Sequence, residues 1–235
     1  MSLYDRIATI YDPWSSSVTE DILFYVDEAL ASGGPVVELA VGTGRIAVPI
    51  AKAGVPVIGV DESDGMLAVA AAFAREQGVE HLVDLRRGDV REPPVTERAP
   101  LVICPFRTLL HLPDSQEKLR ALRAARRLLE PGGRFVFDVF APSREDIDET
   151  HGRWLEREPG IFERADWDEA TRTLALSVRS GDVAATMTLH WATPAEWQGL
   201  IEDAGLELEA LYGWFDRRPF DGGEDTIWVC RTGPA

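Results

Sequence analysis

The stretch Val36-Val37-Glu38-Leu39-Ala40-Val41-Gly42-Thr43-Gly44-Arg45 joins a short apolar run to a glycine turn that opens a helix. The run is rich in valine and leucine and is bounded by Gly33-Gly34-Pro35 and by Gly42, which is typical of a short buried strand. Gly42 and Gly44 have no side chain to keep a ligand from the backbone, and the helix from about Arg45 begins with unpaired N–H groups. This stretch predicts a cofactor cradle, with a plain strand–turn–helix packing turn as the alternative.

Composition sets the limits on the kind of protein. The chain has 235 residues, 45% of them hydrophobic, which is enough for the core of a single globular domain, residues 1–235. The formal net charge is −16. Affinity for a phosphate backbone or an anionic membrane is built from Lys and Arg, so we expect neither a nucleic acid nor a membrane as partner. We expect a small-molecule partner and a monomer or homodimer.

The cysteines and the N-terminus indicate the compartment. Cys104 and Cys230 are the only two cysteines, so no disulfide framework is suggested. The sequence Met1-Ser2-Leu3-Tyr4-Asp5-Arg6 has no apolar signal core, and no apolar run approaches the ~20 residues that span a bilayer. A cytoplasmic location is the prediction.

Strand and helix patterns alternate through the first 140 residues. After a helical N-terminal segment, residues 1–33, five strands are expected at Val36–Leu39, Val57–Val60, Leu82–Arg87, Leu101–Cys104 and Arg134–Phe140. Helical patterns lie between most of them. This rhythm predicts an α/β fold with a Rossmann-like, doubly wound parallel sheet. Ligands bind such sheets beyond the carboxyl ends of the strands.

The rhythm changes near residue 148. Phe162–Trp167, Leu174–Arg179 and Ala185–Trp191 alternate apolar and polar residues, so residues 148–192 are predicted to form an antiparallel β insert after strand five. Leu206–Tyr212 and Thr226–Cys230 are expected to close the main sheet as an antiparallel hairpin, which gives about seven strands in that sheet.

Two aspartates follow strands next to the cradle. Asp61 ends the second strand, seventeen residues after Gly44, where its carboxylate could accept two hydrogen bonds from a ribose diol. Asp89 follows the third strand, where it could accept from an adenine amino group. Each alone is as readily a turn or cap residue. Their joint placement favours an adenosine pocket.

With these motifs the sequence resembles the class I S-adenosylmethionine-dependent methyltransferases, particularly the small-molecule branch, over essentially its whole length. The matching motifs are residues 38–44 (Glu-Leu-Ala-Val-Gly-Thr-Gly), 60–61 (Val-Asp), 88–90 (Gly-Asp-Val), 105–112 (Pro-Phe-Arg-Thr-Leu-Leu-His-Leu) and 129–135 (Leu-Glu-Pro-Gly-Gly-Arg-Phe). The sequence departs from the pattern at Ala40, where many members have a glycine.

The resemblance implies S-adenosyl-L-methionine as cofactor and methyl transfer to a small-molecule N or O acceptor. Glu38 would organise the methionine end, the N-terminal segment would fold over the cofactor as a lid, and the insert would form the acceptor side. The implied cofactor-binding residues are Tyr11, Glu38, Ala40, Gly42, Gly44, Asp61, Glu62, Met66, Asp89, Val90 and Pro105.

Two other functions remain open on the sequence. Gly42-x-Gly44-x-x-Ala47 followed by Asp61 also satisfies a loose nicotinamide fingerprint, so an NAD(P)-dependent oxidoreductase is the first alternative. Against it, Glu38 would repel a pyrophosphate. A non-catalytic S-adenosylmethionine-binding protein is the second alternative.

On the acceptor side His111 is the candidate general base, because an imidazole can take the proton of a hydroxyl acceptor, with a packing or loop-fixing histidine as the alternative. Arg107 is a candidate for binding an acceptor carboxylate or for orienting the loop, with a solvated charge as the alternative. Trp14, Trp191 and Trp214 are candidate substrate-binding aromatics, with ordinary core packing as the alternative. The four histidines lack ligand spacing, so no metal site is predicted. The sequence does not choose between nitrogen, oxygen and carbon as the methylated atom.

Overall fold

The computed structural model describes residues 4–14 and 19–233 and contains two sheets. The main sheet has seven strands in the order β10-β11-β5-β4-β1-β2-β3. Their bounds are β1 Val36–Leu39, β2 Val57–Asp61, β3 Val83–Arg87, β4 Ala99–Cys104, β5 Leu129–Phe140, β10 Glu207–Tyr212 and β11 Asp225–Arg231. Strands β1 to β5 run parallel, and β11 is antiparallel to both β5 and β10. The predicted α/β sheet with an antiparallel final hairpin is confirmed.

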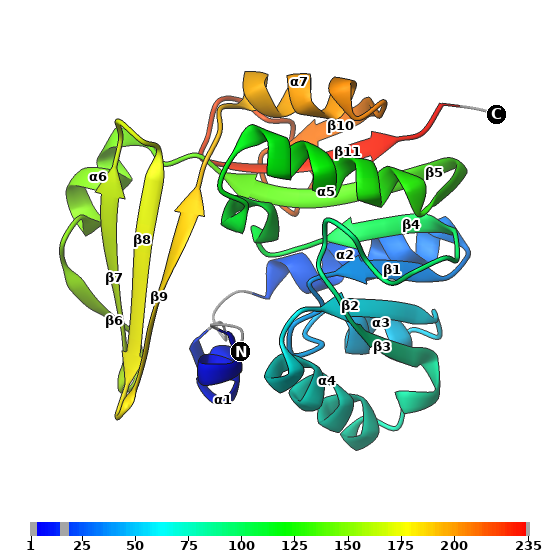
Figure 1. The fold of residues 1–235 in the computed structure, drawn as a ribbon, viewed down its shortest axis with the longest axis horizontal. Coiled ribbons are helices and arrows are strands. Elements are labelled where there is room, and N and C mark those ends of the chain that lie inside the picture. Colours follow the sequence, from blue (N-terminus) through cyan, green and yellow to red (C-terminus); the bar gives the residue numbers. More distant parts are fainter. Residues whose placement is uncertain (1–3, 15–18, 234–235) are drawn as a thin grey trace.

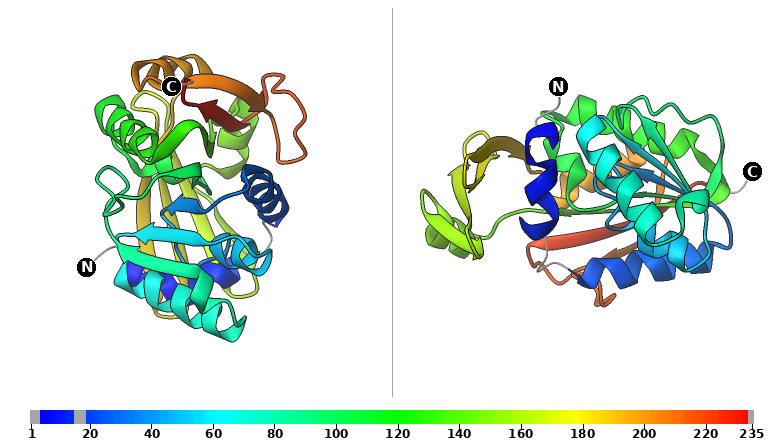
Figure 2. Two further views of the ribbon diagram at one scale, coloured as in Figure 1. Left: turned by 90° about the vertical axis from the view of Figure 1, so that its right-hand side faces the viewer. Right: turned by 90° about the horizontal axis from the view of Figure 1, so that it is seen from below.

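Helices cover both faces of the main sheet (Figures 1 and 2). The main helices are α2 Glu20–Ser32, α3 Ala47–Lys52, α4 Asp64–Glu76, α5 Ser115–Arg127 and α7 Pro194–Asp203, and the short 3-10 turns are η1 Glu80–Leu82 and η2 Thr108–His111. One core cluster joins α5 and α7 to the sheet through Leu122, Trp197 and Phe137. Another joins α2 and α3 to the opposite face through Phe24, Ile50 and Val136.

Local sequence signals fix several helix ends. Ser63 Oγ accepts from the Met66 N–H at the start of α4. Thr193 and Glu196 form a capping box at the start of α7. The helix after the glycine turn begins at Ala47, two residues later than expected. Pro49 therefore lies in the first turn, where backbone N–H groups have no partner within the helix, so the N–H that proline lacks is not needed there.

The insert is a separate antiparallel sheet, β6 Trp154–Glu158, β7 Ile161–Asp168, β8 Thr173–Ser180 and β9 Val183–His190, preceded by α6 Arg144–Thr150. Its inner face buries side chains against helix α1, Tyr4–Trp14, which lies between the insert and α4 (Figures 1 and 2).

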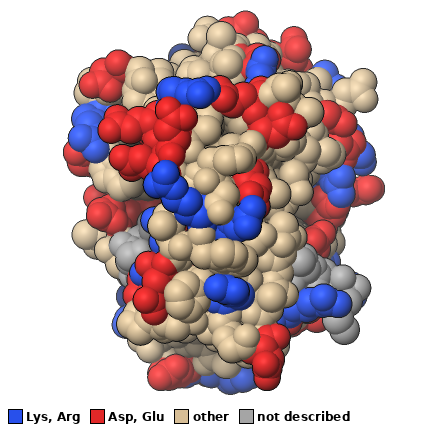
Figure 3. Space-filling view, turned by 90° about the vertical axis from the view of Figure 1, so that its left-hand side faces the viewer, with Lys and Arg blue, Asp and Glu red and all other residues tan. Residues whose placement is uncertain are grey.

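The side of the molecule that carries the insert has a mixed surface. Figure 3 shows acidic and basic side chains interspersed with neutral surface on this side, which is the left-hand side in Figure 1.

The structure corrects several boundaries. Within its described part, the segment 1–33, expected to be helical, forms two helices, and α1 includes Pro13 and ends at Trp14. Residues 15–18 lie outside the described residues, and Thr19 at the N-cap of α2 makes no side-chain cap hydrogen bond. Strand β5 begins at Leu129, five residues earlier than expected, and β6 and α6 were not predicted.

Candidate active site

A cavity of about 500 Å³ lies past the carboxyl ends of the parallel strands, between the glycine turn and the insert. Its volume is within the range of small-molecule sites, about 300–1,000 Å³. The lining residues include Tyr4, Tyr11, Trp14, Ala40, Gly42, Asp61, Glu62, Met66, Gly88, Asp89, Val90, Arg91, Phe106, Arg107, Thr108, His111, Arg157, Glu163, Leu176, Met187 and Leu189. The main sheet, helix α1 and the insert all contribute side chains.

The two glycines of the turn have different surroundings. Both have positive φ, +56° at Gly42 and +83° at Gly44. A Cβ on Gly42 would meet only the Ala40 carbonyl oxygen, at 4.0 Å, and Gly42 lines the cavity. A Cβ on Gly44 would lie 3.2 Å from Val48 Cγ2 and 3.3 Å from Ala70 Cβ. Gly42 therefore leaves space at the cavity, whereas Gly44 lets α4 pack closely against the turn.

Ala40 also has a left-handed backbone, with φ +58°. This conformation is uncommon for a residue with a side chain and explains why a glycine would fit the same position. Ala40 lines the cavity beside Gly42. The departure from the family pattern therefore preserves the turn.

Glu38 lies beneath the turn and is 1% exposed. Burial raises the pKa of its carboxyl well above the ordinary value, an effect that the Arg45 guanidinium partly opposes. Its Oε2 has no hydrogen-bond partner in the described part of the chain. A buried acceptor without a partner is costly, so this oxygen is suited to a donor from a bound ligand, such as the ammonium group of S-adenosylmethionine. Glu38 itself does not border the cavity, so a ligand group has to reach past the glycine turn to contact this oxygen.

Asp61 joins the end of β2 to the glycine turn. Its Oδ2 accepts from the Gly42 N–H at 2.9 Å and its Oδ1 from the Ser63 N–H at 2.8 Å. Burial raises its pKa, and these two backbone hydrogen bonds oppose the rise. Each carboxylate oxygen has a second lone pair for a ligand hydroxyl. Glu62 is exposed beside it and Met66 is buried, and both line the cavity.

Asp89 has a close partner that the sequence reasoning did not consider. The Arg91 guanidinium and backbone N–H both donate to its carboxylate, with Arg91 Nε at 2.8 Å from Oδ1. Hydrogen bonding from Arg91 lowers the pKa of Asp89. Arg91 also pairs with Glu117 of α5. A ligand at this end of the cavity would therefore meet a carboxylate–guanidinium pair.

The segment after β4 supplies the opposite wall. Phe106 and Arg107 both have left-handed backbones, with φ +58° and +61°. The centroids of the Phe106 and Tyr11 rings are 6.1 Å apart. The Arg45 guanidinium lies 4.5 Å from the centroid of the Phe106 ring. Arg107 lines the cavity, but its side chain donates to Asp225 at 2.9 Å and stacks over Phe140.

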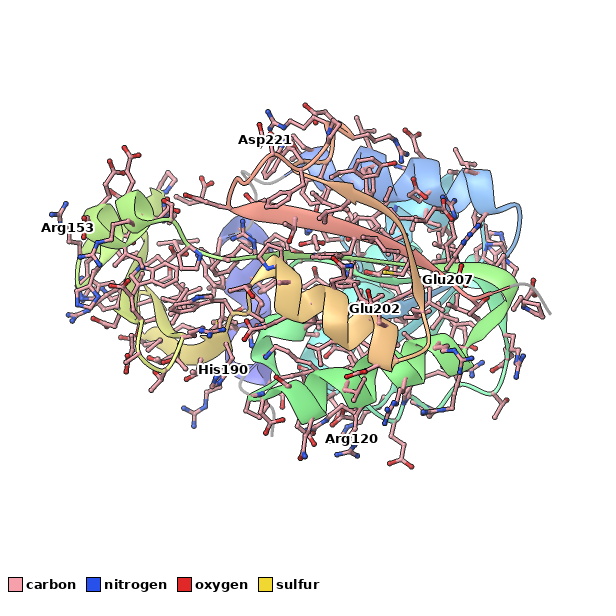
Figure 4. All side chains as sticks on the ribbon, turned by 90° about the horizontal axis from the view of Figure 1, so that it is seen from above. Arg120, Arg153, His190, Glu202, Glu207 and Asp221 are labelled. Carbon is pink, nitrogen blue, oxygen red and sulfur yellow. The ribbon has the colours of Figure 1, made fainter. Side chains whose placement is uncertain are left out.

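His111 contacts the N-terminal helix. Its Nε2 lies 2.8 Å from the Tyr4 hydroxyl, which is also 3.6 Å from Met187 Sδ. Burial lowers the pKa of His111 to about 4, with a smaller contribution from His190. His190 ends β9, at the junction of the insert and the main domain (Figure 4). At neutral pH the His111 imidazole is uncharged and has one nitrogen that accepts a proton.

Helix α1 bridges the two halves of the cavity. On the cofactor-cradle side, Asp5 accepts from Ser63 Oγ at 2.6 Å and from the Gly65 N–H, and Asp12 accepts from Thr43 Oγ1 at 2.5 Å. On the insert side, Trp14 Nε1 donates to Glu163 Oε2 at 3.0 Å. The helix is thereby fastened to both.

The structure gathers most of the predicted site residues around one cavity, but it places five elsewhere. Glu38 and Gly44 lie behind the turn, and Pro105 does not border the cavity. Trp191 packs against Trp167 at the edge of the core, with ring centroids 5.6 Å apart. Trp214 makes an edge-to-face contact with Phe215 in the loop between β10 and β11. Neither tryptophan borders the cavity, so the prediction that they bind substrate through it is not met and the core-packing alternative describes Trp191.

Several lining residues were not predicted. Phe106 lies inside a motif that was recognised, and Tyr4 lies on the expected N-terminal helix. Glu163 lies on β7 between Ile161 and Ala165, which are both buried on the same face of the strand. A charged residue in the apolar half of an alternating pattern is a sequence signal that identifies Glu163 as a candidate site residue. Its Oε1 accepts from Arg157, 3.1 Å away.

Within residues 4–14 and 19–233, which the structure describes, no group of three or more His, Cys, Asp or Glu side chains could hold a metal ion. None of the described helices is long and apolar enough to cross a membrane.

The seven-stranded sheet with its reversed final hairpin and the site at its strand ends define a methyltransferase. A family model described as a methyltransferase domain matches residues 36–133. The structure of the CcbJ methyltransferase from Streptomyces caelestis is 31% identical, with 99% of this chain and 98% of that chain covered and a TM-score of 0.85. The chain belongs to the class I S-adenosylmethionine-dependent methyltransferases, its cofactor is S-adenosylmethionine, and the dehydrogenase and non-catalytic alternatives are wrong.

Two further relatives extend the comparison. The cypemycin N-terminal methyltransferase of Streptomyces sp is 25% identical over 228 residues, which cover 92% of this chain and 89% of that protein. A methyltransferase structure from Clostridium acetobutylicum is 16% identical, covers 99% of this chain and 100% of that chain, and has a TM-score of 0.82, which shows the shared fold.

Proposed function

We propose that this enzyme methylates an amine nitrogen or a hydroxyl oxygen of a small molecule by in-line displacement. The observation that carries the proposal is His111, which is held neutral by burial and lines a cavity of about 500 Å³ beneath α1. Both acceptor types lose a proton when they are methylated, and a neutral imidazole can accept it. The name of the cypemycin N-terminal methyltransferase supports nitrogen as the acceptor atom.

On the cofactor side we propose four contacts. Ala40 and Gly42 approach the cofactor through their backbones, and Glu38 Oε2 accepts from its ammonium group. Asp61 accepts from the ribose hydroxyls with the lone pairs that the backbone leaves free. Further residues assigned to this side are Tyr11, Glu62, Met66, Asp89 and Val90.

On the acceptor side the insert supplies an apolar inner surface with one carboxylate. Leu176, Met187 and Leu189 line the cavity with Trp14, and Glu163 lies among them. We propose that this surface binds the body of the acceptor and excludes water. The N-terminal helix acts as the lid, because it contacts the glycine turn and the insert at once.

The chemistry requires little covalent help from the protein. Bound at these residues, S-adenosylmethionine would supply an electrophilic methyl group and a neutral thioether as the leaving group. His111 takes the acceptor's proton, directly or through the Tyr4 hydroxyl. Orientation of the two reactants and exclusion of water provide the remaining rate enhancement.

Calorimetry and turnover test this proposal. S-adenosylmethionine and S-adenosylhomocysteine are each titrated into the protein, with NADH as the control that is expected not to bind. A panel of small amines and alcohols is then incubated with methyl-labelled cofactor, and labelled products are identified by mass spectrometry. Label transfer to an amine or alcohol supports the proposal. Cofactor binding with transfer only to carbon acceptors, or only to macromolecules, contradicts it.

A further inference from the structure

Two successive residues after β4 have left-handed backbones although neither is glycine. Phe106 has φ +58° and Arg107 has φ +61°. Side chains disfavour this region, and such residues persist where surrounding contacts hold them. The turn matters for the site because both residues line the cavity, and η2, which carries His111, begins directly after Arg107.

Asp138 of β5 makes the contacts that hold this turn. Its Oδ1 accepts from the Phe106 N–H at 2.9 Å and its Oδ2 from the Arg107 N–H at 3.0 Å. The Tyr25 hydroxyl of α2 donates to Oδ1 at 2.6 Å. Two successive N–H groups directed at one anion form a nest, an arrangement that binds negative charge. The carboxylate thereby joins the turn to the central sheet.

The carboxylate does not itself line the cavity. Asp138 is 6% exposed, and its neighbour in the antiparallel pairing is Ile227 of β11. Its influence on a bound molecule must therefore pass through the turn. Phe106 lies beside Tyr11, and the Leu110 N–H donates to the Arg107 carbonyl oxygen at 3.0 Å, so the turn sets the start of the segment that ends in His111.

We propose that Asp138 is a positioning residue for methyl transfer, whose carboxylate holds the Phe106–Arg107 turn and thereby orients His111 and the acceptor side of the cavity. This inference rests on the proposed function, since it takes the β4 end as the acceptor side. The cofactor side is held by separate contacts, namely those of Asp61 with Gly42 and Ser63.

The charges around Asp138 give the positioning a pH dependence. Tyr25 and Asp21 face it from α2, Arg107 from the turn, and Cys104 and Arg45 are its further titratable neighbours. Burial raises the pKa of Asp138 to about 6, and the hydrogen bond from Tyr25 limits the rise. Above this pH the ionised carboxylate accepts all three hydrogen bonds. Below it, one oxygen carries a proton and offers one acceptor fewer.

Amide hydrogen exchange tests the contact without any acceptor molecule. In Asp138→Asn the side chain keeps its size, but its NH2 group cannot accept from a backbone N–H. Exchange at the Phe106 and Arg107 amides is expected to become at least tenfold faster. The Val41 amide, which donates to Val60 in the cradle, is the internal control and is expected to be unchanged. Unchanged protection at Phe106 and Arg107 overturns the proposal, whatever the enzyme methylates.

A matched pair of second substitutions tests whether the turn conformation is what matters. Arg107→Gly and Arg107→Ala remove the same side chain and the same pair with Asp225, but only glycine adopts the left-handed backbone freely. In the Asp138→Asn background, glycine is expected to restore acceptor kcat/KM at least fivefold relative to alanine. Equal kcat/KM in the two double variants contradicts the proposal.

The pH profile separates positioning from a general loss of stability. Wild-type kcat/KM for the acceptor is expected to rise through about pH 6, and this inflection is expected to be absent in Asp138→Asn. Tyr25→Phe removes the donor that lowers the pKa of Asp138, so the inflection moves to higher pH while both backbone contacts remain. The affinity for S-adenosylmethionine, measured by calorimetry, is expected to stay within twofold in both variants. An unmoved inflection in Tyr25→Phe overturns the proposal, and that variant decides the question if Asp138→Asn does not fold.

Discussion

Alanine substitutions at the two glycines of the turn should have different consequences, although the glycines are two residues apart. The added Cβ of Gly44→Ala would lie 3.2 Å from Val48 Cγ2, 3.3 Å from Ala70 Cβ and 3.4 Å from Ala70 Cα. The last of these is backbone of α4, which cannot rotate away. Beyond its two chain neighbours, the added Cβ of Gly42→Ala would have no protein atom closer than 4.0 Å, and it would lie at the cavity.

The magnitudes follow from two effects. A left-handed backbone disfavours a residue with a side chain by roughly 1–2 kcal/mol, and this applies to both variants. Overpacking adds about 1–3 kcal/mol, and this applies to Gly44→Ala alone. Gly44→Ala is therefore expected to lower the free energy of unfolding by about 2–5 kcal/mol, and Gly42→Ala by about 1–2 kcal/mol. For a chain of this size each kcal/mol lowers Tm by about 2–4 °C.

Cofactor binding should show the opposite order. The methyl group of Gly42→Ala occupies space that the proposed cofactor contact requires, so we expect the Kd for S-adenosylmethionine to rise about tenfold or more, which is about 1.4 kcal/mol. Folded Gly44→Ala is expected to bind within about threefold of wild type, because its added atom faces α4. Thermal unfolding and calorimetry at a temperature where both variants are folded measure the two quantities. If Gly42→Ala binds the cofactor like wild type, or is the less stable variant, the assignment of the two glycines is refuted.

Four further predictions concern three side chains. Burial lowers the pKa of His111 to about 4, so the unfolded chain binds a proton at this residue at higher pH than the folded chain does. As pH falls from about 6.5 to 4, the free energy of unfolding of wild type should therefore decrease by roughly 3 kcal/mol relative to that of His111→Gln. Urea unfolding at several pH values measures this difference. His111→Gln should also lower kcat by about 10²–10⁴-fold with unchanged cofactor affinity, and an unchanged rate would exclude the base role. Glu38→Gln keeps the buried shape and should retain Tm while weakening cofactor affinity about tenfold in calorimetry; equal affinity would exclude the ammonium contact. Trp14→Phe removes the hydrogen bond to Glu163 and should raise the KM for the acceptor severalfold with little effect on the Kd for the cofactor. A change in the cofactor Kd alone would place Trp14 on the cofactor side of the cavity.

The cofactor half of the site was largely predictable because it is local in sequence. Ala40, Asp61 and Asp89 each lie at or just after the end of a parallel strand, and the strand rule places those ends at one edge of the sheet. Asp61 and Gly42, nineteen residues apart, are in fact joined by a hydrogen bond. The different roles of Gly42 and Gly44 were not predictable from the sequence. The closeness of Ala70 to Gly44 depends on how α4 packs against the turn.

The acceptor half was less predictable because its contacts are distant in sequence. The hydrogen bond between Trp14 and Glu163 joins residues 149 apart, and that between Tyr4 and Met187 joins residues 183 apart. The period-two pattern located three strands of the insert, but β6, Trp-Leu-Glu-Arg-Glu, has no such alternation. The alternation of apolar and polar residues also does not show which side chains meet a cavity. Trp191 is a substrate-binding candidate on the sequence, whereas in the structure it packs against Trp167.

Helix α1 connects the two halves, and its contacts imply that they do not act independently. Asp5 and Asp12 hold it to the loops after β1 and β2, while Tyr4 and Trp14 hold it to η2 and the insert. A rigid helix that moves away from one half loosens its contacts with the other. If α1 is the lid that we propose, cofactor contacts that order the glycine turn also favour the position of α1 that closes the acceptor side. The coupling is reciprocal by linkage, so an acceptor that closes the lid must raise cofactor affinity by the same factor.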